Sequence, residues 1–70
     1  MEKRYSVPNV NCEHCVNAIT GELSKIEGIH HVNVDLERKT VTVKAAEDVV
    51  DERIRAGIDE AGFDIEHELD

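Results

Sequence analysis

The sequence has few of the residues that stabilise very small folds or mark common binding surfaces. Its 70 residues include no tryptophan, one tyrosine, one phenylalanine, one proline and two cysteines. Two cysteines in a C-x-x-C spacing are too close to cross-link distant parts of the chain, so a domain of this size must depend on packing. The shortage of aromatic residues argues against the aromatic sheet surface of an RNA-recognition module.

Long apolar runs are absent as well. No stretch approaches the roughly 20 apolar residues of a membrane-spanning helix, and the N-terminal residues lack the apolar segment of a secretory signal. We therefore expect a cytoplasmic protein without membrane insertion. In that reducing compartment, a C-x-x-C pair is more typical of metal or catalytic chemistry than of a structural disulfide.

Basic residues are scarce in the last third of the chain. Residues 1–46 carry six acidic and six basic side chains, whereas residues 47–70 carry ten acidic and two basic ones, so the whole net charge of −8 arises there. An acidic surface repels phosphate groups, which argues against nucleic acid and anionic membranes as partners. It favours a basic patch on a protein partner, although the same charge would also serve solubility alone.

Hydrophobic periodicity predicts a strand, a helix and a hairpin in the first two thirds of the chain. Residues 3–7 alternate as a half-buried strand does, and residues 13–27 carry a single apolar stripe. Gly28 follows that stripe where a left-handed helix cap belongs. Renewed alternation over 29–36 and 41–45, around a charged turn, predicts two antiparallel strands.

A second helix and a last strand are predicted in the remaining third. Asp48 is a candidate N-cap for this helix and Gly62 a candidate terminator. Gly57 costs about 1 kcal/mol relative to Ala unless close packing requires it. The predicted inner face of the helix consists of Val50, Ile54, Ile58 and Ala61, and the alternating residues of the strand are Phe63, Ile65, His67 and Leu69.

The order of these elements is strand, helix, strand, strand, helix, strand. Each helix has one apolar stripe, so both are expected to pack on the same face of a sheet. Right-handed crossovers then give an α+β fold, the ferredoxin-like βαββαβ sandwich with a four-stranded antiparallel sheet and two helices on one face. Residues 1–70 are expected to form a single domain, because no linker or repeat interrupts them.

Cys12 and Cys15 are the candidate metal ligands. Cys12 is expected in the loop after the first strand and Cys15 in or near the first turn of the following helix, a spacing that lets both sulfurs converge on one point. The unpaired N–H groups and positive dipole of a helix N-terminus favour thiolate over thiol. Two exposed thiolates form a ligand set for a soft metal ion.

Among soft metals, Cu(I) fits this pair best. Structural zinc requires four ligands, and the sequence has no second C-x-x-C. His30 and His31 are adjacent in a predicted strand and therefore point to opposite faces. We expect one Cu(I) per chain, held by two cysteines with an open coordination position, while Ag(I), Zn(II) and Hg(II) stay as alternatives.

The residues from Asn9 to Cys15 read NVNCEHC, and together with the order of elements they resemble the heavy-metal-associated (HMA) domain family over essentially the whole chain. This family includes copper chaperones and the metal-binding domains of copper-transporting P-type ATPases, and its motif reads G-M-[TH]-C-x-x-C. The resemblance implies that Cys12 and Cys15 bind the metal. Asn9 replaces the usual glycine. Val10 replaces the usual methionine, an apolar residue that tethers the loop to the core, and we expect Val10 to do the same.

Three further residues are candidates for a supporting role. The resemblance puts Phe63 near the metal, where its ring would shield the thiolates unless it is only a core residue of the last strand. His14 is a possible auxiliary ligand, a bridge in a metal-linked homodimer or a source of positive charge, but we favour a solvent-facing spacer. Asn11 is neutral where zinc- and cadmium-selective relatives often have Asp, which favours copper.

The resulting functional hypothesis is a cytosolic Cu(I) chaperone, not an enzyme. The sequence shows no Ser/His/Asp set, paired catalytic carboxylates or phosphate loop. The resemblance implies transfer by thiolate ligand exchange to a copper-transporting P-type ATPase or its metal-binding domain. One alternative is a domain excised from a copper- or zinc/cadmium-transporting ATPase. A small thiol-disulfide redox protein is a weaker alternative, because a thioredoxin-like fold needs a longer chain and a parallel strand pairing.

Overall fold

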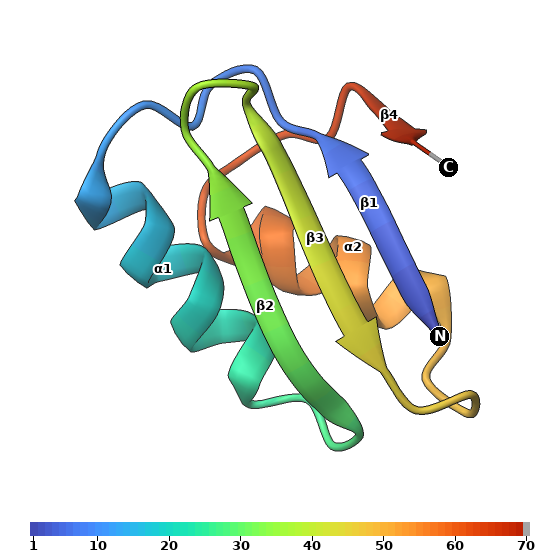
Figure 1. The fold of residues 1–70 in the computed structure, drawn as a ribbon. Helices are drawn as coiled ribbons and strands as arrows, with labels where there is room; N and C mark the ends of the chain where they lie inside the picture. Colours follow the sequence, from blue (N-terminus) through green and yellow to red (C-terminus); the bar gives the residue numbers. More distant parts are fainter. Residues whose placement is uncertain (70) are drawn as a thin grey trace.

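A computed structural model describes residues 1–69, so the predicted domain, 1–70, extends one residue beyond the described part. Figure 1 shows the two helices and four strands in the predicted order. In chain order they are β1 (Glu2–Ser6), α1 (Glu13–Ser24), β2 (Ile29–Asp35), β3 (Thr40–Ala45), α2 (Asp51–Glu60) and β4 (His67–Leu69).

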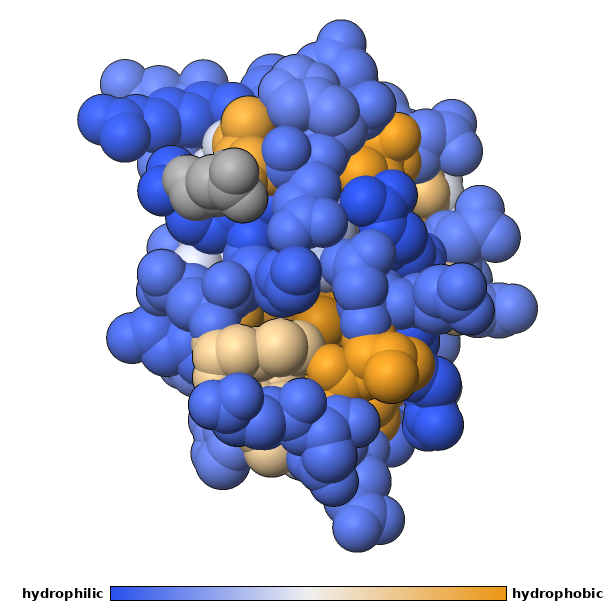
Figure 2. All heavy atoms as spheres, turned by 90° about the vertical axis from the view of Figure 1, so that its right-hand side faces the viewer, coloured by the Kyte–Doolittle hydropathy of each residue, from blue (hydrophilic) through white to orange (hydrophobic). Residues whose placement is uncertain are grey.

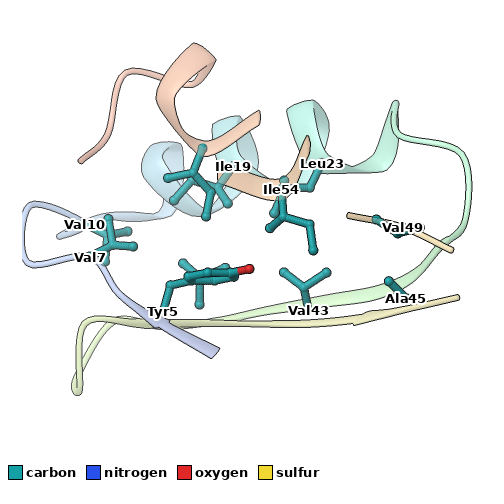
Figure 3. Close-up of a cluster of buried hydrophobic side chains, with 11 residues drawn as sticks. Tyr5, Val7, Val10, Ile19, Leu23, Val43, Ala45, Val49 and Ile54 are labelled. Carbon is teal, nitrogen blue, oxygen red and sulfur yellow. The ribbon is translucent and has the colours of Figure 1, made fainter. Parts of the chain in front are cut away.

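The four strands form one antiparallel sheet in the order β2-β3-β1-β4. Tyr5, near the end of β1, lies opposite Val41 of β3 on one side and Glu68 of β4 on the other. Both helices lie on the same side of the sheet (Figure 3). The opposite face carries polar side chains such as Arg4 and Thr42. The ferredoxin-like prediction is therefore confirmed.

The core lies between the sheet and the two helices. Strand residues point their apolar side chains toward the helices, and Ile19 and Leu23 of α1 meet Ile54 of α2 above them (Figure 3). Ile58 of α2 belongs to the same buried cluster. Gly57 allows the helices to approach closely, because a Cβ there would lie 2.7 Å from Cδ2 of Leu23. Close packing therefore accounts for this glycine. The buried hydrophobic residues are Tyr5, Val7, Val10, Ile19, Leu23, Val41, Val43, Ala45, Val49, Ile54 and Ile58.

The hairpin between β2 and β3 closes with a turn built on Asp35. Its carboxylate accepts hydrogen bonds from the backbone N–H groups of Glu37 and Arg38, both at 3.0 Å. Lys39 then adopts a left-handed conformation with φ 59° before β3 begins. This turn lies at the same end of the molecule as the loop that follows β1 (Figure 1).

The boundaries of α1 and α2 differ from the predicted ones. Helix α1 ends at Ser24 rather than Glu27, and Gly28 lies in the turn before β2 with φ +97°. Helix α2 begins at Asp51, and its N-cap is Val50, so Asp48 does not cap it. Because the backbone of Val50 is extended, its side chain leaves the helical stripe and is 57% exposed. Val49 is buried in its place.

The last strand is shorter than predicted. Residues 63–66 are irregular, since the N–H of Phe63 bonds to the carbonyl of Ile58 and keeps the segment close to the end of α2. The chain joins the sheet only where the N–H of Glu66 bonds to the carbonyl of Ser6 at 2.7 Å. In β4, Glu68 lies opposite Tyr5 on the helix-covered face, so His67 and Leu69, two of the alternating residues of the predicted strand, lie on the other face, and the side chain of His67 is exposed.

Neither helix in residues 1–69 is long and apolar enough to cross a membrane. Hydrophilic residues cover most of the face in Figure 2, and the apolar atoms on it form small separate areas. The large apolar residues that are exposed are Met1 and Val50. The folded surface therefore has the polar, acidic character that the composition indicates.

Candidate metal centre

The loop between β1 and α1 is held to the rest of the domain through two buried valines. The N–H of Val7 donates to the carbonyl of Lys39, in the β2–β3 turn, at 2.8 Å. The N–H of Val10 then donates to the carbonyl of Val7 at 3.2 Å, which closes a turn through Pro8 and Asn9. Both valine side chains are fully buried (Figure 3). Val10 thus tethers the loop to the core as predicted, although it is smaller than the methionine it replaces.

Asn9 fits this turn without the conformational freedom of glycine. Within residues 1–69, Lys39 is the one residue other than glycine with a positive φ, so the backbone of Asn9 lies in an ordinary region. Its side-chain Oδ1 accepts a hydrogen bond from the N–H of Asp64 at 3.4 Å. The loop is therefore held from a second direction by the segment that follows α2.

Cys12 and Cys15 converge where the loop becomes α1. Cys12 has an extended backbone, with φ −157° and ψ 170°, and its carbonyl accepts the N–H groups of Cys15 at 3.1 Å and Val16 at 3.2 Å. This first turn brings the two Sγ atoms to 3.2 Å, and neither cysteine is in a disulfide. Cys12 is exposed, whereas Cys15 is half-buried against the core. The sulfur of Cys12 is therefore accessible, whereas Cys15 packs against the core.

The surroundings of Cys15 favour its thiolate. A hydrogen bond from the backbone of Asn11, and then one from the side chain of Cys12, lower the pKa of the Cys15 thiol, and partial burial opposes them. The Sγ atom of Cys15 also lies 3.6 Å from Oδ1 of Asn11. No side chain caps the N-terminus of α1. Because Cys12 is the N-cap and Cys15 lies in the first turn, the positive end of the helix dipole is close to both sulfurs. Asn11 thus lies beside the cysteine pair.

His14 does not join the cysteines in a larger ligand cluster. Over the described residues, 1–69, no group of three or more His, Cys, Asp or Glu side chains is placed to hold a metal ion. His14 is exposed in the first turn of α1. The candidate site consequently consists of two sulfurs.

Phe63 lies in the loop after α2, outside any strand. Its half-buried side chain packs against the same core that Cys15 borders. The hydrogen bond from Asp64 to Asn9 places the backbone next to Phe63 against the loop between β1 and α1. The sequence pattern did not indicate this contact, because its two residues are 55 positions apart and Asp64 belongs to no motif.

Comparison with known proteins gives consistent matches. The model of the heavy-metal-associated domain matches residues 4–64. The copper chaperone CopZ of Staphylococcus haemolyticus is 32% identical over 66 residues, which cover 93% of this chain and 97% of that protein. Human copper-transporting ATPase 2 is 33% identical over 60 residues, which cover 84% of this chain and 4% of that protein.

The fold is also that of a solved relative. A CopZ metallochaperone structure superposes with a TM-score of 0.88 at 26% identity, covering 93% of this chain and 98% of that one. The converging cysteines, the order of elements and these matches agree with one another. The chain belongs to the heavy-metal-associated domain family.

Proposed function

We propose that this protein is a copper chaperone that carries one Cu(I) between Cys12 and Cys15. The observation that carries the proposal is the pair of free sulfurs, 3.2 Å apart on an accessible loop, in a domain with this fold and family. Residues 1–70 would act together as one cytoplasmic, non-enzymatic metal-binding domain. Its relatives include a copper chaperone and a copper-transporting ATPase.

The choice of Cu(I) follows from the chemistry of the donor set. Two soft thiolates suit Cu(I), and Ag(I) or Hg(II) would bind for the same reason. Structural Zn(II) prefers four ligands and would need donors from another molecule, such as a second copy in a metal-bridged homodimer. Metal–thiolate bonds of about 2.3 Å allow sulfurs up to about 4.6 Å apart on one ion. A small outward movement of exposed Cys12 would therefore admit the metal.

Transfer would proceed by exchange of sulfur ligands. Cys12 is accessible, so a thiolate of the partner would approach the ion from that side and form a three-coordinate intermediate. Cys12 would then leave, and a second thiolate of the partner would replace Cys15. Copper stays Cu(I) throughout, and each departing thiolate gains either a proton or another metal ion.

The partner we propose is a copper-transporting P-type ATPase or its metal-binding domain. Glu52, Asp59 and Glu60 are exposed on α2 and contribute to the acidic surface of the last third of the chain. They would attract a basic patch on the partner, which predicts slower transfer as salt screens these charges. Transfer rates that do not change with ionic strength would contradict this electrostatic part of the proposal.

The deciding experiment is a titration of the reduced protein with Cu(I) in competition with a chromophoric Cu(I) chelator. We expect binding of one ion per chain, loss of most of the affinity in Cys12→Ser and Cys15→Ser, and much weaker binding of Zn(II). His14→Ala is the matched control, because His14 lies between the cysteines but outside the proposed ligand set. Copper binding that survives loss of Cys12, or zinc bound as tightly as copper, would refute the proposal.

A further inference from the structure

The side chain of Asn9 connects the cysteine loop, residues 7–12, to the segment that follows α2. Its Oδ1 accepts the hydrogen bond from the N–H of Asp64 at 3.4 Å. Asn9 occupies a position where the family pattern has glycine, which has no side chain to make such a bond. The contact is therefore a property of this chain rather than of the motif.

Asp64 is a well-anchored donor for this bond. On its N-terminal side, the N–H groups of Gly62 and Phe63 bond to the carbonyls of Asp59 and Ile58 at 2.9 and 3.2 Å, which hold the segment to the end of α2. On its C-terminal side, the N–H of Glu66 bonds to β1 at 2.7 Å. A loop attached to Asp64 is thus attached to both α2 and the sheet.

The cysteine loop is less restrained beyond this point. Val10 is buried, but Asn11 and Cys12 are both exposed before α1 begins. Cys12 is the sulfur that must move when a metal ion enters or leaves, and it lies three residues after Asn9. A restraint at Asn9 consequently acts on the exposed half of the site without contacting the ion.

We propose that Asn9 is a positioning residue, whose hydrogen bond to Asp64 holds the cysteine loop closed and slows the release of bound copper. The part that concerns copper rests on the proposed function, whereas the part that concerns the loop does not. Loss of one such neutral hydrogen bond should speed opening about threefold to tenfold. Asn9 itself is exposed, so its replacement should leave the core unchanged.

The first test uses the reduced, metal-free protein. Asn9→Ala should raise amide hydrogen exchange at Asp64 and lower the NMR order parameters of the cysteine loop, with little change in the melting temperature. Asn9→Asp, which keeps an oxygen acceptor, should retain the protection at Asp64. Asn33→Ala, at an exposed position of β2, is the matched control. Wild-type exchange at Asp64 in Asn9→Ala, or equal loss of protection in Asn9→Asp, would overturn the proposal.

The second test follows removal of Cu(I) by excess chelator in stopped flow. Release from Asn9→Ala should be about threefold to tenfold faster than from the wild type, and release from Asn33→Ala should be unchanged. Equal rates in Asn9→Ala and the wild type would overturn the role in release. Failure of the wild type to bind Cu(I) would refute the proposed function and this role together, while the metal-free test would still decide whether Asn9 holds the loop.

Discussion

The phenol hydroxyl of Tyr5 donates a hydrogen bond to the carboxylate of Asp51 and thereby joins β1 to the first turn of α2. The ring of Tyr5 is fully buried. The second carboxylate oxygen of Asp51 accepts a bond from Nε of Arg55 at 2.6 Å, and this guanidinium lies 5.5 Å from the centre of the tyrosine ring. Arg55 also pairs with Glu68 of β4 at 3.5 Å. One cluster thus fixes α2 against two strands.

Replacing Tyr5 by phenylalanine tests the contribution of the hydroxyl group. The ring would still fill the core, but Asp51 would lose a donor. We expect Tyr5→Phe to lower the free energy of unfolding by about 1–2 kcal/mol, measured by urea denaturation. An unchanged free energy of unfolding would show that water replaces the hydroxyl at no cost.

The carboxylate of Asp51 should make stability depend on acidic pH. Partial burial raises its pKa, but the hydrogen bonds from Tyr5 and Arg55 and the charge of Arg55 outweigh that effect, so the pKa of Asp51 is lowered in the folded state. Its contribution to stability is therefore present above the unfolded value of about 3.9 and is lost as the pH falls through the folded value. Asp51→Asn should be less stable at neutral pH and lose less stability on acidification. Parallel stability curves from pH 7 to about 3 would contradict this assignment.

Tyr5 should make stability depend on alkaline pH. Burial first, and then the hydrogen bond to Asp51 and the nearby carboxylates, raise the pKa of Tyr5. Its contribution is complete below the unfolded value of about 10 and is lost as the pH rises above it. The ultraviolet absorbance of ionised tyrosine should therefore appear together with unfolding on alkaline titration. Ionisation near pH 10 (about the unfolded value) in a chain that stays folded would count against this prediction.

Two glycines, one on each helix, should respond in opposite directions to the same substitution. A Cβ at Gly21 of α1 has no atom within 4 Å, so Gly21→Ala should stabilise the protein by about 0.5–1 kcal/mol. A Cβ at Gly57 would lie 2.7 Å from Leu23 and 3.4 Å from Ile26, so Gly57→Ala should destabilise it by about 1–3 kcal/mol. Thermal unfolding of the two variants checks both signs. Stabilisation of both variants would show that helix propensity alone governs them, and destabilisation of both would contradict the prediction for Gly21.

Removing the neighbouring thiol should partly restore the ordinary acidity of Cys15. The backbone of Asn11 is the first cause of the lowered pKa of Cys15, and the side chain of Cys12 is the second. In Cys12→Ala, therefore, the pKa of Cys15 should rise but stay below that of a free thiol. The pH dependence of thiolate absorbance or of alkylation measures this change, with Cys15→Ala as the reference for Cys12. A pKa of Cys15 that does not rise in Cys12→Ala would contradict the second cause.

The sequence predicted the order of elements and the site of converging cysteines because both depend on short-range patterns. Alternation marks β1, β2 and β3, and the C-x-x-C spacing brings two sulfurs together within one helical turn. Prediction from the sequence failed where a tertiary contact or the backbone conformation overrides the pattern. Val50 has the right spacing for the inner face of α2, but its extended N-cap backbone turns it outward.

Contacts between residues far apart in the sequence determine the features that the sequence did not predict. Alternation continues through residues 63–69, yet the hydrogen bonds of Phe63 and Asp64 to α2 and Asn9 keep the first half of that segment out of the sheet. The bond between Tyr5 and Asp51 spans 46 positions. Because neither partner in such a pair has a local signature, the pairing can be seen only in the folded chain.

The sheet order also determines when a newly made chain can finish folding. β1 is synthesised first, yet its neighbours are β3 and β4, and the last of these comes at residues His67–Leu69. Pairing across such a span requires the closure of a long loop, whereas the β2–β3 hairpin is local and can form early. During translation, the edge of β1 that pairs with β4 therefore stays unpaired until β4 has been synthesised. The cysteine loop continues directly from β1, so nascent chains should bring Cys12 and Cys15 into their native arrangement only after β4 has been synthesised.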